Sequence, residues 1–341
     1  MDISHHIANY WISIDNESIQ CQLCPRNCKL KNGQKGFCFV RQNINGQLLL
    51  NAYGHSSGFA IDPIEKKPLN QFYPGSDTLS FGTTGCNLGC QFCQNWDISK
   101  STELEKLSTK ATPKDIAQMA KQKNCKSVAF TYNDPIIFTE YAIDTAIECH
   151  KLNIKTVAIT AGYINDLPRK DFFHHMDGAN IDLKSISNDF YRKFCNVEIR
   201  PILDTLIYLK NETDLWFEIT NLLIPQENDS TDQISKLCDW VLKNLGDNIP
   251  IHFSAFHPAY KLLDHKRSEP QSIIDAREIA LKKGIKYVYT GNIFDPKGSS
   301  TYCTTCKKKI IDRTGYTIKN IHISNNKCEF CGSLIEGRFD S

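Results

Sequence analysis

Apolar residues in the central part of the chain fall into two kinds of segment that alternate. Seven short runs consist of successive β-branched and apolar residues, which is typical of parallel strands buried on both faces. The pattern predicts strands at residues 78–82, 127–132, 155–160, 179–183, 215–223, 251–256 and 286–289.

Between these runs, apolar residues recur at three- and four-residue spacing, which predicts helices. The helical segments are 113–122, 138–152, 231–244 and 271–283. Thr112 suits the N-cap of the first helix, and Pro113 suits its first position. Strand–helix alternation repeated this often predicts an α/β fold on a parallel sheet, either open or closed into a barrel.

The chain divides into three predicted segments by composition. Residues 77–295 form the α/β core, while residues 1–76 and 296–341 are turn-rich, cysteine-rich and strand-poor, so we expect small metal-held appendages there. A net charge of +2 gives no reason to expect nucleic acid or a membrane surface as a partner. No stretch approaches the ~20 apolar residues of a membrane span. The N-terminus lacks a secretory pattern, so we expect a cytoplasmic location, where disulfides are rare.

Fifteen cysteines in a reducing compartment point to metal binding. Eleven of them form three groups, and the other four are expected to be small buried hydrophobes. The groups are Cys21, Cys24, Cys28 and Cys38; Cys86, Cys90 and Cys93; and Cys303, Cys306, Cys328 and Cys331, while the isolated residues are Cys125, Cys149, Cys195 and Cys238.

The central group follows the first predicted strand with three cysteines, Cys86, Cys90 and Cys93. Three thiolates can hold three corners of a [4Fe–4S] cluster and leave one iron open to bind a substrate. A structural zinc would need a fourth ligand, which would have to come from far along the chain. Because the loop follows the C-terminal end of a parallel strand, we predict a catalytic cluster here.

The C-terminal group forms two Cys-x2-Cys knuckles on either side of a hydrophobic hairpin at residues 310–316. This arrangement is typical of a zinc ribbon or a rubredoxin. Spacing does not separate zinc from a single iron. Zinc is favoured because so short a tail needs a metal to fold.

The N-terminal group, Cys21-x2-Cys24-x3-Cys28-x9-Cys38, is more ambiguous. It could hold zinc or an auxiliary [4Fe–4S] cluster that passes electrons inward. Pro25 after a cysteine is similar to ferredoxin loops, but the nine-residue gap fits neither pattern, and the prediction leans to zinc. Arg26 and Arg41 could instead belong to a docking surface.

The spacing of the central group is that of the radical S-adenosylmethionine (SAM) superfamily. Further runs resemble the radical SAM component of the AmmeMemoRadiSam system, which is itself similar to pyruvate formate-lyase activating enzymes. The runs are 62–69, 72–75, 80–86, 130–135, 180–184, 218–225, 252–258 and 289–292. The resemblance implies a partial (β/α)6-type barrel with a [4Fe–4S] cluster and SAM. It also implies a reductant such as flavodoxin or ferredoxin, and Memo-like and Ammecr-type partner proteins.

The resemblance further implies residues that contact SAM. Phe92 should pack near the adenine, and residues 131–134 correspond to the turn that receives the amino group of SAM, although related sequences carry Glu in place of Asp134. Asp182 and Lys184 point the same way from their strand, so they form either an ion pair that fixes the barrel or a contact to SAM or substrate. Glu218 and His257 have the same two interpretations. The predicted cofactor-binding residues are Phe92, Thr131, Tyr132, Asn133, Asp134, Asp182, Lys184 and His257.

These features imply an oxidoreductase-type enzyme that cleaves SAM to a 5′-deoxyadenosyl radical, which abstracts hydrogen from a substrate. A small molecule or protein side chain, handled together with the partner proteins, is the favoured substrate. A backbone glycine, as in glycyl-radical activases, is the alternative. A non-catalytic iron–sulfur and zinc electron carrier or scaffold is the alternative of another class, but it would not need seven strands of this kind.

Overall fold

The computed structural model describes residues 6–101 and 109–339. The chain clusters into two compact units. Unit 1 comprises Met1–Asp62, Asp77–Asp177 and Arg200–Thr205, and unit 2 comprises Pro63–Ser76, Gly178–Ile199 and Leu206–Ser341. None of the helices within the described ranges is long and apolar enough to cross a membrane.

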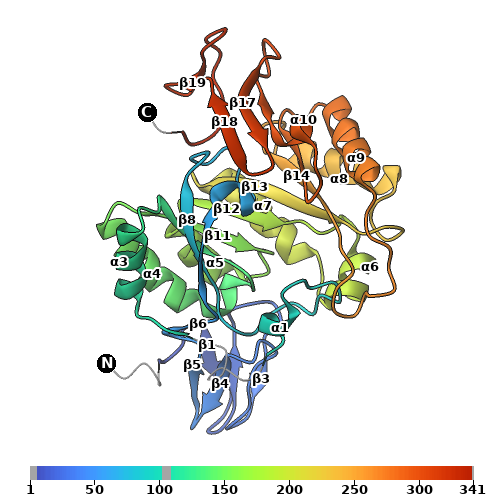
Figure 1. Ribbon diagram of the computed structural model, residues 1–341. Coiled ribbons are helices and arrows are strands. Elements are labelled where there is room, and N and C mark those ends of the chain that lie inside the picture. Colours follow the sequence, from blue (N-terminus) through green and yellow to red (C-terminus); the bar gives the residue numbers. More distant parts are fainter. Residues whose placement is uncertain (1–5, 102–108, 340–341) are drawn as a thin grey trace. The chain divides into compact units, whose positions relative to one another are not determined.

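The elements follow one another as labelled in Figure 1. The strands are β1 (Trp11–Ser13), β2 (Ile19–Cys21), β3 (Lys29–Leu30), β4 (Arg41–Ile44), β5 (Gln47–Leu50), β6 (His55–Ser56), β7 (Phe59–Pro63), β8 (Asp77–Phe81), β9 (Thr109–Lys110), β10 (Ser127–Phe130), β11 (Lys155–Thr160), β12 (Gly178–Asp182), β13 (Trp216–Leu223), β14 (Ile251–Ala255), β15 (Val288–Gly291), β16 (Thr301–Tyr302), β17 (Lys309–Thr314), β18 (Thr317–Ile321), β19 (Ile323–Ser324) and β20 (Lys327–Cys328). The helices are η2 (Ile64–Lys66), α1 (Trp96–Ser99), α3 (Pro113–Gln122), η3 (Pro135–Phe138), α4 (Thr139–Lys151), α5 (Asp166–His174), α6 (Asn188–Phe190), η4 (Tyr191–Cys195), α7 (Arg200–Glu212), α8 (Thr231–Asn244), α9 (Pro270–Lys283) and α10 (Pro296–Ser299).

Unit 1 contains a sheet in the order β7–β8–β10–β11, in which β10 runs parallel to β8 and to β11. α3 begins with a capping box, since the Thr112 side chain accepts from the Asp115 N–H and Asp115 accepts from the Thr112 N–H. α3 packs beside α4, and α4 covers β10 and β11 (Figure 1). The β8, β10 and β11 positions are mostly buried, as expected for parallel strands covered on both faces.

Unit 2 contains four parallel strands in the order β12–β13–β14–β15. α8 and α9 pack against each other, and α9 also covers β14 and β15. α9 ends at Gly284, whose φ of +107° is the left-handed conformation that favours glycine at a helix C-terminus.

The predicted α/β class is confirmed, and all seven predicted core strands and all four predicted helices are present within two residues of their predicted ends. The expectation of strand-poor ends is wrong. The N-terminal segment contains the antiparallel β1–β2–β3 sheet and the β4–β5 hairpin, and the C-terminal segment contains β16–β17–β18 and β19–β20. The hairpin predicted at residues 310–316 corresponds to β17 and the turn to β18. The other strands were missed because two to five residues are too few for a clear alternation of apolar and polar positions.

Candidate functional site

The three central cysteines lie on the loop between β8 and α1 of unit 1. Gly85, directly before Cys86, has a φ of +84°, and a Cβ built on it would lie 2.0 Å from the carbonyl oxygen of Cys38. Only glycine fits so close an approach in this conformation. The loop is therefore pressed against the segment that carries the N-terminal cysteines.

The thiols of this loop suit cluster ligands more than a single metal ion. Cys86, Cys90 and Cys93 are each partly exposed, and the Leu88 N–H donates to Cys86 Sγ at 3.4 Å. Burial raises the pKa of the Cys86 and Cys93 thiols, so a bound cation is needed to hold them as thiolates. Among the residues that the structure describes, their sulfur atoms do not all lie within 4.8 Å of one another, as those of the C-terminal group do. Ligands of different irons in a cube stand farther apart than ligands of one ion.

The turn after β10 holds both ends of this loop. Asn133 Nδ2 donates to Thr83 Oγ1 at 3.0 Å and to the Gly85 carbonyl at 2.9 Å. The Tyr132 carbonyl accepts from Asn95 Nδ2 at 2.8 Å, beyond the last cysteine. Tyr132 has a φ of 70°, which lies in the left-handed region that is uncommon for residues other than glycine. The turn and the cysteine loop thus form one hydrogen-bonded structure.

Asp134 is buried and its carboxylate is engaged within the protein. It accepts from the Ile136 N–H at 3.1 Å, from Thr160 Oγ1 at 2.7 Å and from the Ala161 N–H at 3.0 Å. These bonds join the turn to the end of β11. The carboxylate therefore positions the turn, and any contact of Thr131, Tyr132, Asn133 or Asp134 with SAM stays a prediction, as it does for the buried Phe92.

In unit 2, Lys184 Nζ lies 2.8 Å from Asp182 Oδ2, and the two side chains are 14% and 34% exposed. The backbone N–H of Lys184 donates to the Tyr191 hydroxyl at 2.9 Å. The ion pair forms, and a contact of either side chain with SAM or substrate stays a prediction. His257 follows β14 and is half-buried.

Glu218 is completely buried, and both oxygens of its carboxylate accept hydrogen bonds. Its carboxylate accepts from the backbone N–H groups of Asn70 and Gln71 at 2.9 and 2.7 Å. It also accepts from Trp216 Nε1 at 3.1 Å and contacts His252 Nε2 at 2.6 Å. Glu218 therefore holds the segment before β8 onto β13.

One face of the unit 2 sheet carries a polar row that sequence reasoning missed. Strand register places Asp182 opposite Thr220, Thr220 opposite His252, and His252 opposite Tyr289. Within the described ranges, Thr220 Oγ1 is buried and has no hydrogen-bond partner. A polar face inside a parallel sheet is costly unless it is used. The sequence does show polar residues at every second position of β12, β13 and β14. Their lying side by side, however, depends on the register of the strands, which the sequence pattern does not specify.

The four C-terminal cysteines converge on one point, with all ligand atoms within 4.8 Å of one another. Cys303 Sγ lies 3.7 Å from Cys331 Sγ, and Cys306 Sγ lies 3.8 Å from Cys328 Sγ. A tetrahedron of thiolates at about 2.3 Å from one metal has edges of about 3.8 Å. Although burial acts against it, hydrogen bonds from Ser333 and nearby backbone N–H groups lower the pKa of Cys303 to about 6. The group fits a single tetrahedral ion, and both zinc and iron satisfy this geometry.

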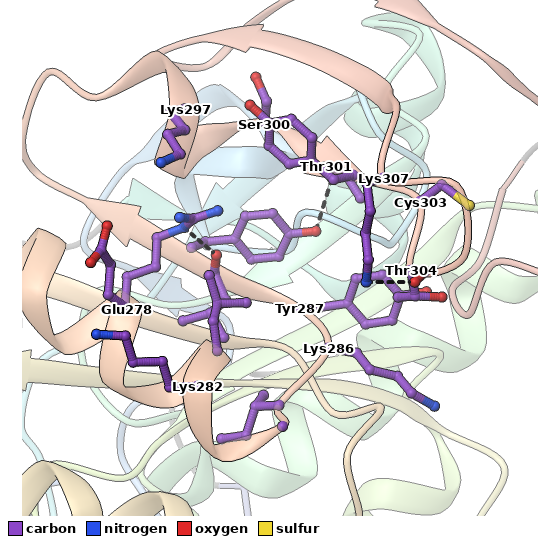
Figure 2. Close-up of a pocket in the computed structure, with 17 residues that line it drawn as sticks. Glu278, Lys282, Lys286, Tyr287, Lys297, Ser300, Thr301, Cys303, Thr304 and Lys307 are labelled. Carbon is purple, nitrogen blue, oxygen red and sulfur yellow. Dashed lines mark hydrogen bonds between the residues drawn. The ribbon is translucent and has the colours of Figure 1, made fainter.

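Unit 2 also has a cavity of about 620 Å³ beside this group (Figure 2). Residues of α9, of β15 and of the segment through Cys303 line it. The cavity contains no predicted cluster or SAM ligand, so it is not assigned to the reaction. Its charged lining residues are Arg277, Glu278, Lys282, Lys286, Lys297 and Lys307.

Comparison with known proteins identifies relatives of this chain. Residues 81–238 match the profile of the Radical SAM superfamily. An uncharacterised protein from Methanocaldococcus jannaschii is 38% identical over 331 residues, 96% of this chain and 98% of the relative. Two further relatives are the 4-hydroxyphenylacetate decarboxylase activating enzyme of Clostridioides difficile (24% identity, 49% of this chain, 55% of the enzyme) and the pyruvate formate-lyase-activating enzyme of Listeria monocytogenes (26% identity, 49% and 72%).

The fold is similar to that of a radical SAM methyltransferase from Sphaerobacter thermophilus. The TM-score is 0.50 at 15% identity, and the match covers 84% of this chain and 76% of that chain. At this identity the likeness concerns the fold alone.

Proposed function

Because the chain belongs to the radical SAM superfamily and is related to glycyl-radical-enzyme activases, we propose that it cleaves SAM reductively and uses the 5′-deoxyadenosyl radical to take hydrogen from a substrate. The observation that carries this proposal is the loop of three partly exposed thiols tied to the turn after β10. In the described part of this loop there is no fourth cysteine, which leaves one iron of a bound cluster without a protein ligand.

Cys86, Cys90 and Cys93 would hold a [4Fe–4S] cluster, which supplies an electron and a binding site for the amino and carboxylate groups of SAM. The chain orients SAM around it. Backbone carbonyls of residues 131–133 would accept from the amino group, and Asp134 would fix the turn that presents them.

Other residues would contact the rest of SAM or the substrate. Phe92 would pack near the adenine. The Asp182–Lys184 pair, His257 and the unpartnered Thr220 hydroxyl are the polar groups offered by unit 2. We propose that they orient SAM and substrate, since a polar face inside a parallel sheet is retained where it is used.

For the substrate, we propose a small molecule or a protein side chain, handled with Memo-like and Ammecr-type partners and a flavodoxin or ferredoxin as reductant. The runs that resemble the AmmeMemoRadiSam component support this choice. A backbone glycine is the second candidate, favoured by relatives whose names describe activating enzymes. Incubation with deuterated candidates distinguishes the two, because the true substrate transfers deuterium into 5′-deoxyadenosine.

The test of the activity is an anaerobic assay of the reconstituted and reduced chain with SAM, with 5′-deoxyadenosine and methionine as readouts. We expect product from the wild type and none from Cys90→Ala. Cys238→Ala is the matched control, since Cys238 is buried in α8 and isolated from the metal-ligand groups. Absence of product from the wild type, or undiminished product from Cys90→Ala, would contradict the proposal.

A further inference from the structure

We propose that the N-terminal group Cys21, Cys24, Cys28 and Cys38 binds a second [4Fe–4S] cluster that passes electrons to the cluster at Cys86, Cys90 and Cys93. The site itself is argued from unit 1 alone, while its electron-relay role rests on the proposed function. This inference reverses the preference for zinc at this group.

All four cysteines line one small cavity, which Arg41 of β4, Asn87 and Ile137 also line. Cys21 ends β2, and its N–H donates to the Cys28 carbonyl at 3.0 Å. Cys24 begins a tight turn in which the Asn27 N–H donates to the Cys24 carbonyl at 3.0 Å. The strand pairing and the turn thus direct residues up to 17 positions apart into the same space, as a ligand set requires.

Gly36 leaves room between two of the sulfur atoms. A Cβ built on Gly36 would lie 3.8 Å from both Cys28 Sγ and Cys38 Sγ. The backbone N–H of Gly36 donates to the Arg41 carbonyl at 2.8 Å, and this bond holds the residue in place. A longer side chain here would fill the space that an inorganic core between these sulfurs needs.

The spacing of the sulfurs favours a cluster over a single ion. Around one ion, thiolates stand about 3.8 Å apart, and the C-terminal group shows this geometry. Among the residues the structure describes, the sulfur atoms of the four N-terminal cysteines do not all lie within 4.8 Å of one another, whereas those of the four C-terminal cysteines do. Four cysteines that share a cavity without converging on a point fit the larger four-iron core.

Two arginines lie at this cavity. Arg41 is 1% exposed and its charge is balanced by a buried ion pair with Glu140, so the net positive charge comes from Arg26. Arg26 stacks over the Phe37 ring, with 3.4 Å from its Cζ to the ring centroid. Buried and stacked guanidinium groups beside the sulfurs favour an anionic occupant.

The same segment contacts the catalytic loop directly. Arg26 Nε donates to the Asn87 carbonyl at 2.5 Å, and Asn87 follows Cys86. Gly85, directly before Cys86, packs against the Cys38 carbonyl. Arg26, two positions from Cys24, and Cys38 itself therefore touch the two residues on either side of Cys86, which provides a short path for an electron.

The electron balance is simple. A flavodoxin or ferredoxin gives one electron to the oxidised N-terminal cluster. That cluster returns to its oxidised state as it gives the electron to the cluster at Cys86. No proton or atom moves in this step.

Acid-labile sulfide tests the site, because zinc and single iron sites contain none. The full chain with Cys86→Ala, Cys90→Ala and Cys93→Ala is reconstituted anaerobically with iron and sulfide. We expect about eight sulfides in the wild type and about four in this triple variant. Adding Cys24→Ala and Cys28→Ala should reduce the sulfide to near zero, whereas adding Cys238→Ala should leave about four.

A triple variant with bound zinc and near-zero sulfide would overturn the proposal, whether or not the five-substitution variant folds. If the wild type retains its sulfide but makes no 5′-deoxyadenosine, the proposed function fails while the second cluster stands. The electron relay is tested separately. The quantity measured is the initial rate of 5′-deoxyadenosine formation with reduced flavodoxin, divided by the rate with titanium(III) citrate. Cys24→Ala with Cys28→Ala should lower this ratio about tenfold, Cys238→Ala should not change it, and an unchanged ratio in the double variant would refute the relay.

Discussion

Replacing Glu218 with glutamine tests whether this buried carboxylate is architectural or catalytic. Oε1 accepts from the Gln71 N–H and from Trp216, and Oε2 accepts from the Asn70 N–H and contacts His252. A glutamine keeps the shape of the side chain but turns one acceptor into a donor. Two of the four partners then face an N–H₂ group instead of an oxygen.

The loss of free energy on substitution is set by the less costly of the two orientations that the glutamine amide can take. With the amide nitrogen in place of Oε2, His252 can change tautomer and accept a bond, but the Asn70 N–H cannot. One buried N–H without a partner costs about 1–3 kcal/mol. With the amide nitrogen in place of Oε1, two N–H donors lose their acceptor, so the first orientation prevails. An opening free energy reduced by about 2 kcal/mol corresponds to amide exchange faster by about 30-fold.

Hydrogen exchange of the peptide that contains Asn70 and Gln71 measures this effect. Glu227→Gln is the matched control, because Glu227 contacts Lys193 and His265 near the surface at 3.1 and 3.3 Å and should leave these two amides unchanged. Exchange that stays at the wild-type rate in Glu218→Gln would refute the reasoning. If 5′-deoxyadenosine formation were then lost, Glu218 would belong to the chemistry.

Three further predictions concern unit 1. Hydrogen bonds from His150, Lys155 and the Thr156 N–H outweigh burial and lower the pKa of Asp177 to about 2. Asp177→Asn should therefore lose about 2 kcal/mol in urea unfolding at pH 7, a difference that shrinks as the pH falls from about 4 towards 2. Arg41→Met should cost about 3–5 kcal/mol because it leaves Glu140 buried and unpaired, and adding Glu140→Met should recover much of this loss in a double-mutant cycle. Gly85→Ala should reduce soluble yield and bound sulfide far more than Gly33→Ala, which has a similar φ of +79° but open space around it, and equal effects would exclude the Cys38 contact as the cause.

Local patterns were enough to predict the seven core strands and four of the core helices, whereas α5 and α7 were missed. Buried apolar runs such as β11 and capped amphipathic segments such as α3 depend on neighbouring residues, and both lie where their residues predict them. The C-terminal cysteine group was predictable for a similar reason, since two knuckles across one hairpin converge with little choice of geometry.

Features that depend on long-range contacts could not be predicted in this way. His252 and Thr220 become neighbours only through the register of β13 and β14, which no single strand specifies. The approach of Gly85 to Cys38 joins residues 47 positions apart. The resemblance predicts that Asp134 belongs to a turn that receives SAM, but it could not predict that hydrogen bonds to Thr160 and Ala161 engage the carboxylate in holding this turn to β11.

The segment Pro63–Ser76 belongs to unit 2, and part of its contacts there are with residues near the other end of the chain. Glu65 and Asn70 meet Arg313, and the backbone of Gln71 and Tyr73 bonds that of Arg338. At a translation rate of about 5–20 residues per second, Arg338 is synthesised roughly 13 to 52 s after Ser76. During synthesis, the buried polar groups of this early segment must therefore wait for their partners. A chain stopped before Arg313 would leave Glu65 without its arginine, and the carbonyls of Asn70 and Gln71 and the N–H of Tyr73 without their partners, so such nascent chains are expected to depend on chaperones.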